Sequence, residues 1–233
     1  MATAPAKLTA EGRRNQILRV ATRLFALQGF QGTTTKEVAH RAGVTEALIF
    51  RHFASKEALY WAVIQSKIKG ASSPRERMRQ NLETSGSDND VLSRVASEIL
   101  ERRTKDQTLS RLLLYTALEN HRLSHRFFRT YAAGHYEVLA EYIRRRIAEG
   151  GFRPVDPLLA ARGLLGMIIY HSWVQELFGG KRYQRFSVKE VSGTLVDIWL
   201  QGMLQKHKTV GNGFSHSGNG RRHSRSNLRA QNS

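Results

Sequence analysis

The sequence predicts an all-α fold, mainly because of how its apolar residues are spaced. They recur three and four positions apart over long stretches, which is the period of a helix, whereas half-buried strands alternate at every second position. The chain has only 4 prolines in 233 residues, so few positions interrupt a helix. Hydrophobic residues make up 40% of the chain, which is enough for a packed core.

Two short helices joined by a tight turn are predicted within the stretch from Thr34 to Lys56. Ala39 is small enough for a second helix to cross it closely, and Gly43 can end the first helix in a left-handed conformation. Ile49 then points back from the second helix to pack under the first. This spacing is typical of a helix-turn-helix over about residues 34–53, although an ordinary helical corner can share it.

Both short helices carry start signals. Thr34 and Glu37 have the spacing of a capping box, and Thr45 is a second N-cap. A helix with an apolar face is predicted directly upstream, over about residues 11–29, where a three-helix DNA-binding unit needs a bracing helix. Together with the helix that follows the motif, these elements predict a DNA-binding domain over residues 11–70.

Composition limits the partners and the chemistry. The formal net charge of +18 and a pI near 10.9 indicate a polyanionic partner, either nucleic acid or an anionic membrane surface. The sequence has no Cys, which excludes disulfides, thiolate nucleophiles and Cys-bound zinc. It also has no apolar run near the roughly 18 residues of a membrane span and no apolar signal segment at its start. We therefore expect a cytoplasmic protein that does not span a membrane. With a helix-turn-helix in the same chain, we expect nucleic acid and no membrane as its polyanionic partner.

A larger helical domain is predicted over residues 71–206, after a break at ASSP. Asp90 is expected to cap one of its helices. The helix over 157–178 is apolar on more than one face and must be buried on more than one side. Residues 207–233 form a basic tail that we expect to be disordered, and that either adds salt-sensitive DNA affinity or only solubility.

The run GFQGTTTKEVAHRAGVTEALIFRHFASKEALYWAVI, with the helix before it, resembles the N-terminal domain of the TetR family of bacterial transcriptional regulators. The resemblance covers roughly residues 11–70. It implies a homodimeric regulator, usually a repressor and more rarely an activator, that binds a palindromic operator in double-stranded DNA. It also implies that residues 71–206 bind a small-molecule effector and dimerise, through about 157–178 and 187–206.

The second helix of the motif departs from the family at the positions that would read DNA. Where Lys-Gly-Thr-Leu-Tyr is frequent, this chain has Glu46, Ala47, Leu48, Ile49 and Phe50. Leu48 offers only apolar contact, for instance with a thymine methyl group, and Glu46 can accept from cytosine or face solvent. The predicted DNA-binding residues, whether through bases, phosphates or the helix caps, are Thr34, Thr45, Glu46, Ala47, Leu48, Phe50, Arg51, His52 and Lys56.

The resemblance also implies an effector cavity, and its candidates are aromatic residues at helical spacing and two histidines that lie among apolar residues. Residues of these types are more often core or satisfied surface side chains than ligand contacts, and their assignment to a pocket rests on the resemblance. The predicted effector-pocket residues are Tyr115, Phe128, Tyr131, His135, Tyr170, His171 and Trp173. His121 and His125 are four residues apart, but the metalloprotease Glu is missing between them, so we expect no metal.

Three classes of function compete at this point. The leading prediction is a dimeric DNA-binding transcriptional regulator, a repressor that a small molecule releases from its operator. The alternative is a basic DNA-binding or architectural protein without sequence preference. An all-α enzyme is the third class, and we expect neither catalytic residues nor a cofactor, because the sequence has no paired carboxylates and no nucleophile motif.

Overall fold

The computed structural model describes residues 8–68, 73–119 and 121–205, and within them it confirms the all-α prediction. Extended pairing there is limited to one isolated antiparallel bridge between Phe152 and Leu204. The basic tail predicted over 207–233 lies outside the described residues. No helix in the part of the chain that the structure describes is long and apolar enough to cross a membrane.

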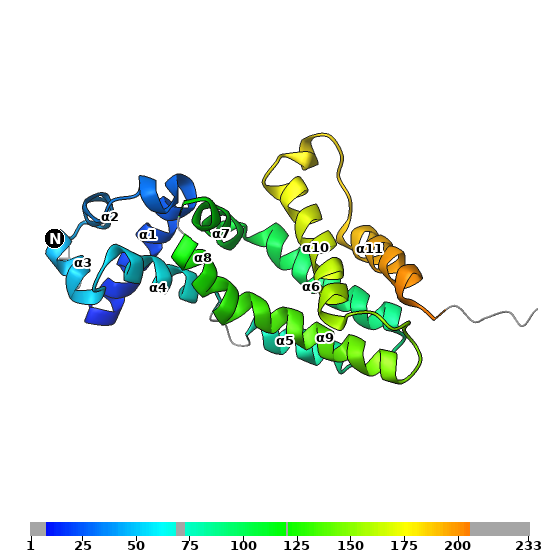
Figure 1. The fold of residues 1–233 in the computed structure, drawn as a ribbon. Helices are drawn as coiled ribbons and strands as arrows, with labels where there is room; N and C mark the ends of the chain where they lie inside the picture. The colour runs from blue at the N-terminus through cyan, green and yellow to red at the C-terminus, as the bar shows by residue number, and fades with distance from the viewer. Residues whose placement is uncertain (1–7, 69–72, 120, 206–233) are drawn as a thin grey trace, which may run out of the picture.

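Four helices form one end of the molecule (Figure 1). They pack on a shared core that includes Ile17, Phe25, Ile49 and Tyr60. Leu112 of the following domain belongs to the same core, so the two domains share buried surface. The bounds are α1 Ala10–Gly32, α2 Thr35–Ala42, α3 Glu46–His52 and α4 Lys56–Ile68.

The remaining helices extend away from this end, with α7 and α8 next to the first four and α11 farthest from them (Figure 1). A second hydrophobic core joins α5, α6, α9, α10 and α11, and contains Leu92, Ile143, Leu164 and Trp199. The bounds are α5 Pro74–Leu82, α6 Asp88–Lys105, α7 Thr108–Glu119, α8 His121–Phe127, a π-helical turn Phe128–Ala132, α9 Ala133–Ala148, α10 Pro157–Glu176, a 3₁₀ turn Gly180–Arg182 and α11 Val188–Met203.

The turn between α2 and α3 has the predicted geometry. Gly43 adopts a left-handed conformation with φ 62° and ψ 40°. Its N–H donates to the His40 carbonyl, and the Val44 N–H donates to the Ala39 carbonyl at 3.0 Å. Ile49 is fully buried against this turn, as its spacing predicted. The turn therefore fixes how α3 lies across α2.

Two helix starts differ from their predictions. Thr34 accepts from the Glu37 N–H, but the Glu37 carboxylate pairs with Arg41 at 3.2 Å instead of returning to the cap, so only half of the predicted capping box forms. The prediction that Asp90 is an N-cap is wrong. Ser87 caps α6, and Asp90 is the third residue of a complete capping box.

The helix predicted from about Ser124 to Glu149 is also not uniform. It consists of α8, the π-helical turn Phe128–Ala132 and α9. A π turn adds a residue to the helical repeat, so it changes which side chains face the core on either side of it.

Gly43→Ala is expected to lower the free energy of unfolding by roughly 1–2 kcal/mol, because a Cβ is disfavoured in the left-handed conformation. Nothing lies within 4 Å of the added Cβ, so backbone strain rather than a clash determines the loss in the free energy of unfolding. Urea unfolding measures it. The matched control is Gly193→Ala inside α11, where the added Cβ also meets nothing and stabilisation of about 0.5–1 kcal/mol is expected. Equal effects at the two sites would contradict this explanation.

Candidate nucleic-acid interface

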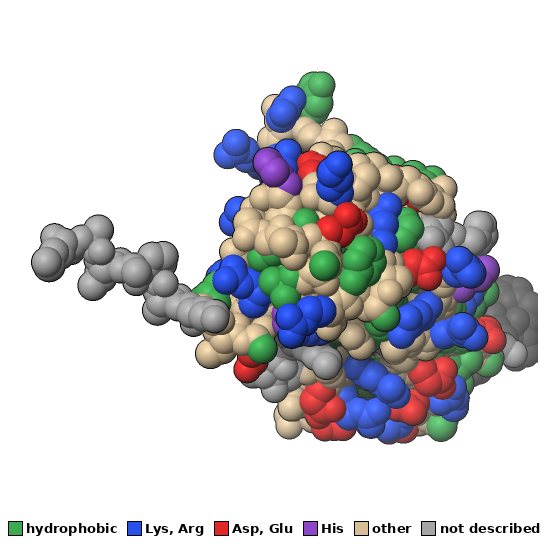
Figure 2. All heavy atoms as spheres, turned by 90° about the vertical axis from the view of Figure 1, so that its left-hand side faces the viewer, with side chains coloured by type: hydrophobic (Ala, Val, Ile, Leu, Met, Phe, Trp, Pro, Cys, Tyr) green, Lys and Arg blue, Asp and Glu red, His purple; other side chains and the backbone are tan. Residues whose placement is uncertain are grey.

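The outward face of α3 carries three exposed side chains, Ala47, Phe50 and Arg51. They are three and four residues apart and therefore lie on one side of the helix. Phe50 is 47% exposed, so a large apolar side chain is accessible on this face. Figure 2 looks onto this end of the molecule and shows Lys and Arg side chains distributed around hydrophobic ones, with Asp and Glu side chains among them. The face offers apolar contact bordered by positive charge.

The other side chains of α3 are held from behind. Leu48 and His52 are half-buried, and Ile49 is completely buried. The Glu46 carboxylate accepts a hydrogen bond from the Thr35 hydroxyl on α2. Glu46 thus ties the two helices together, whereas the sequence left open whether it reads a base or faces solvent.

The two N-cap threonines are exposed at the starts of α2 and α3. The Thr34 hydroxyl oxygen accepts from the Glu37 N–H at 3.0 Å, and that of Thr45 accepts from the Leu48 N–H at 3.3 Å. Each hydroxyl also has a proton to donate, because capping uses it only as an acceptor. Capping and phosphate binding are therefore compatible at both positions.

Lys56 begins α4, and its ammonium lies 4.4 Å from the centre of the Phe30 ring. Partial burial lowers its pKa, and Glu119 acts in the opposite direction. Arg14 of α1 lies 5.0 Å from the Phe53 ring centre. Both cations are therefore positioned by aromatic rings of the DNA-binding domain.

The end of α1 is held by side chains from α7. The Arg111 guanidinium donates to the Ala26 carbonyl at 2.7 Å, and the Tyr115 hydroxyl donates to the Leu27 carbonyl at 3.1 Å. The Glu119 carboxylate accepts from the Gln31 N–H at 2.9 Å. These contacts satisfy backbone groups that a helix end leaves unpaired. We call Arg111, Tyr115 and Glu119 the α7 clamp.

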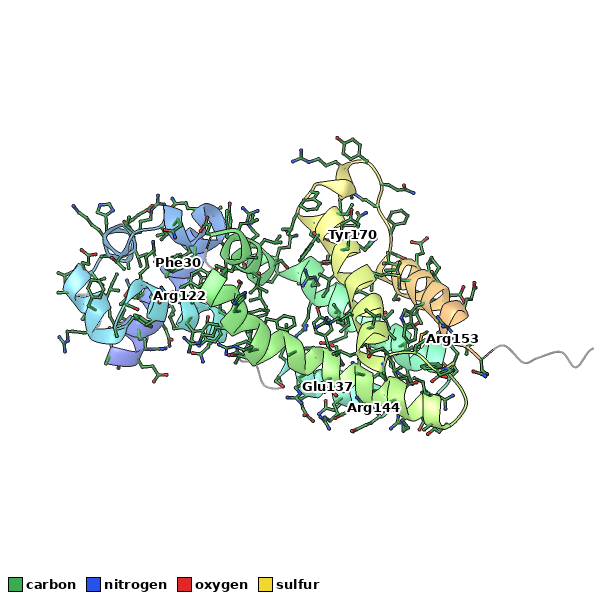
Figure 3. The ribbon with its side chains drawn as sticks, in the orientation of Figure 1. Phe30, Arg122, Glu137, Arg144, Arg153 and Tyr170 are labelled. Carbon is green, nitrogen blue, oxygen red and sulfur yellow. The ribbon has the colours of Figure 1, made fainter. Side chains whose placement is uncertain are left out.

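The α7 clamp lies where α1 is broken by Gly29, whose φ is 76°. Buried Tyr60 of α4 strengthens the same junction, since its hydroxyl donates to the Leu112 carbonyl at 2.6 Å and also contacts Thr116. Burial raises the pKa of Tyr60 to about 12, so the hydroxyl keeps its proton at neutral pH. Arg122 of α8 adds an ion pair with Glu57 at 3.2 Å, in the region shown in Figure 3.

Gly29→Ala is expected to lower the free energy of unfolding by about 2–4 kcal/mol. The backbone of Gly29, with φ 76° and ψ −178°, lies in a region that is essentially restricted to Gly and accounts for about 1–3 kcal/mol. The new Cβ also collides with the Glu119 carboxylate, whose bond to Gln31 is worth about 1 kcal/mol. Urea unfolding of Gly29→Ala in a Glu119→Ala background is the control. The penalty should fall there by about 1 kcal/mol, to the cost of the backbone conformation alone, and an unchanged penalty would rule out the collision.

The predicted effector-pocket residues are spread over several environments. Tyr115 belongs to the α7 clamp. Tyr131 packs on Trp61 with ring centres 5.8 Å apart, and its carbonyl lies 2.7 Å from His135 Nδ1. Phe128 lies 6.2 Å from the Tyr136 ring. Phe128, Tyr131 and His135 thus lie in the π-helical turn and at the start of α9.

The α10 candidates face other directions. Tyr170 is 63% exposed on the outer surface (Figure 3). His171 packs edge-on against Phe186 with ring centres 5.9 Å apart, and lines a cavity of about 250 Å³. Trp173 has a buried indole N–H with no partner among the described residues. A separate polar groove of about 690 Å³ lies between α6 and the start of α11 and contains none of the seven.

The fold and the surface of α3 define a DNA-binding protein of the helix-turn-helix class. Residues 17–63 match the model of bacterial regulatory proteins of the tetR family, and residues 90–202 match that of the C-terminal domain of AefR-like transcriptional repressors. The chain belongs to the TetR family, as its resemblance predicted, and is a DNA-binding transcriptional regulator. Its curated relatives include a protein named as a transcriptional activator and others named as nucleoid occlusion factors.

Individual relatives differ in their described roles. Nucleoid occlusion factor SlmA from Photobacterium profundum is 30% identical over 159 residues, covering 67% of this chain and 80% of SlmA. The transcriptional activator FasR from Mycolicibacterium smegmatis is 36% identical over 74 residues, but the match spans only 34% of FasR and 31% of this chain. The solved structure of NalD, a secondary repressor of an efflux pump in Pseudomonas aeruginosa, matches the fold with a TM-score of 0.65 at 20% identity, covering 85% of this chain and 98% of NalD.

Proposed function

We propose that this regulator is a dimeric repressor, which a small-molecule effector releases from a palindromic operator. The observation that carries the proposal is the outward face of α3, whose Ala47, Phe50 and Arg51 side chains are free to enter a major groove. Phe50 contacts thymine methyl groups there, and Arg51 contacts phosphate. The DNA backbone on either side of the groove is contacted by Thr34, Thr45 and Lys56.

The proposed dimer forms through the outer faces of α10 and α11. Leu159 and Tyr170 on α10 are 69% and 63% exposed, and Ile198 on α11 is 55% exposed. Gly163 and Gly166 lie between the two α10 residues and expose backbone for close helix approach. Apolar side chains on two adjacent helices are what a symmetric interface covers. Dimerisation sets two α3 helices about 34–36 Å apart, one turn of DNA.

In this proposal, the α7 clamp couples effector binding to the release of DNA. It binds the DNA-reading domain to a helix of the effector domain through Arg111, Tyr115 and Glu119. An effector that prefers a different position of α7 therefore changes the distance between the two α3 helices. It can shift the equilibrium only by its difference in affinity for the two arrangements.

Fluorescence anisotropy with DNA that flanks the gene tests the proposal. A repressor of this kind binds that DNA far more tightly than a scrambled duplex of the same length, at physiological salt. Its affinity also falls with added salt, because phosphate contacts release counterions. Equal binding of the flanking and scrambled duplexes would contradict the proposed operator.

A second candidate is a DNA-binding protein that acts on the chromosome rather than on one promoter. The relative SlmA is described as a nucleoid occlusion factor, and it aligns with 67% of this chain. Mapping of bound sites across the genome separates the two. A few sites next to genes indicate a transcriptional repressor, whereas many sites unrelated to promoters indicate the second candidate.

A further inference from the structure

Lys56 is a candidate phosphate contact, and its ammonium lies close to the C-terminal end of α1. It stands 4.4 Å from the centre of the Phe30 ring, which is labelled in Figure 3. The same ring packs edge-on against Tyr60, with ring centres 5.3 Å apart. Lys56 and Tyr60 are four residues apart on α4, so they share one face of that helix. This face of α4 is therefore directed toward the end of α1.

The helix α7 meets the same face of α4. Thr116 contacts the Tyr60 hydroxyl, and Glu119 is three residues further along α7, on the same side of that helix. The Glu119 carboxylate accepts from the Gln31 N–H at 2.9 Å, and Gln31 follows Phe30 directly. The carboxylate on α7 thus reaches the same end of α1 as the ammonium on α4.

The backbone of α1 leaves room for this carboxylate, because a Cβ added to Gly29 would overlap the Glu119 carboxyl group. In the described part of the chain, the lysine ion pairs are those of Lys67 and Lys181, so the Lys56 ammonium is not in direct contact with a carboxylate. Burial lowers the pKa of Lys56, and the Glu119 carboxylate acts against this by favouring the charged form. The two charges therefore interact without forming an ion pair.

A DNA phosphate that approaches Lys56 meets an ammonium that already interacts with a negative charge. Attraction to the carboxylate lowers the free energy of the unbound protein, so less is gained when the phosphate arrives. Both side chains are half-buried, and ions in solution screen such charges less than fully exposed ones. The hydrogen bond to the Gln31 N–H holds the carboxylate in place, so it does not simply turn into solvent when DNA binds.

We propose that the Glu119 carboxylate competes with DNA phosphate for Lys56, and that it thereby limits the affinity of this regulator for DNA. Glu119 is a positioning residue in this role, because it acts on DNA through Lys56. The inference rests on the proposed function, since it requires Lys56 to face a phosphate. Glu119 belongs to α7, so a shift of α7 changes this competition as well as the distance between the two α3 helices.

A double-mutant cycle tests the competition, by fluorescence anisotropy of the full-length protein with the flanking DNA. Glu119→Gln keeps an oxygen that can accept from the Gln31 N–H but removes the charge. It should raise the affinity about threefold to tenfold at low salt. Lys56→Met alone should weaken binding, and adding Glu119→Gln to it should change the affinity less than about twofold.

Glu137→Gln is the matched control, because it removes the same charge from the whole protein. Glu137 pairs with Arg144 on α9 at 3.2 Å, and Figure 3 shows both away from α3. Its affinity for the flanking DNA should stay within about twofold of wild type. A gain equal to that of Glu119→Gln would mean that net charge is responsible and would overturn the proposal.

Circular dichroism melting checks that each variant is folded. If Glu119→Gln does not fold, Glu119→Ala takes its place in the cycle, because the lost bond to Gln31 affects both backgrounds equally and cancels. Unchanged or lower affinity in Glu119→Gln would overturn the proposal. The same gain in the Lys56→Met background would also overturn it, since Glu119 would then act without Lys56.

The proposed operator can fail separately from this inference. If the flanking and scrambled duplexes bind equally, the operator is contradicted, but the cycle can still be measured on either duplex, because phosphate contacts carry no sequence information. A gain that requires Lys56 on both duplexes would then sustain the competition.

Discussion

Ala47→Glu is expected to weaken operator binding by at least about 100-fold while leaving the free energy of unfolding unchanged or slightly higher. Ala47 is exposed at the second position of α3, so a carboxylate there faces the phosphates of any DNA that α3 approaches. Like charges brought together in an interface cost several kcal/mol. A helix N-terminus favours a carboxylate, so the same change does not harm the fold. Anisotropy and urea unfolding measure the two effects.

Ala117→Glu is the matched control for this variant. Ala117 is exposed on α7, away from α3, and the substitution adds the same charge to the whole protein. If the two variants lose operator affinity equally, overall charge and not the α3 surface controls binding. If Ala47→Glu binds as well as wild type, α3 is not the reading helix.

Replacing both Leu159 and Ile198 by Glu is expected to convert the protein into a monomer at micromolar concentration. Each side chain is more than half exposed, at 69% and 55%, so the folded protomer should lose little stability. In a symmetric dimer the change brings four carboxylates into one apolar interface, at a cost of several kcal/mol. Sedimentation velocity gives the mass. Operator affinity should also fall when the dimer is lost, because a monomer has a single α3 and binds only one half-site.

Leu118→Glu is the control for dimerisation. Leu118 is 87% exposed on α7, outside the proposed interface, and should leave the mass unchanged. A monomeric wild-type protein, or a double variant that remains dimeric, would contradict the assignment of the interface to α10 and α11.

Local rules explain why the helix-turn-helix could be predicted from the sequence. Gly43 is required by the backbone conformation of the turn, and Ile49 by the packing of two adjacent helices. Both requirements involve residues within about a dozen positions of each other in the sequence. Helix caps also depend on nearby residues, but a carboxylate near a cap can pair with another side chain instead of the cap. Glu37 has Arg41 one turn away and pairs with it, whereas Asp90 returns to Ser87 and completes a box.

Contacts between segments that are distant in the sequence could not be predicted from it. Arg103 sits in the run ERRTKD, which has the pattern of a solvated helix end, and only the approach of α10 buries it against Ser172. Tyr115 was predicted to line an effector pocket, but the fold directs its hydroxyl to the end of α1. The π-helical turn at Phe128–Ala132 contains neither Pro nor Gly, so no residue type marks it.

Hydroxyl-radical footprinting of the DNA flanking the gene tests the central claim most directly. If two α3 helices of one dimer read the operator, protection appears on one face of the duplex, in two blocks with centres about 34–36 Å apart or a multiple of that spacing. Ala47→Glu should remove both blocks, and Ala117→Glu should keep them. Uniform protection without spacing, or blocks that persist in Ala47→Glu, would contradict the claim that the outward face of α3 reads DNA.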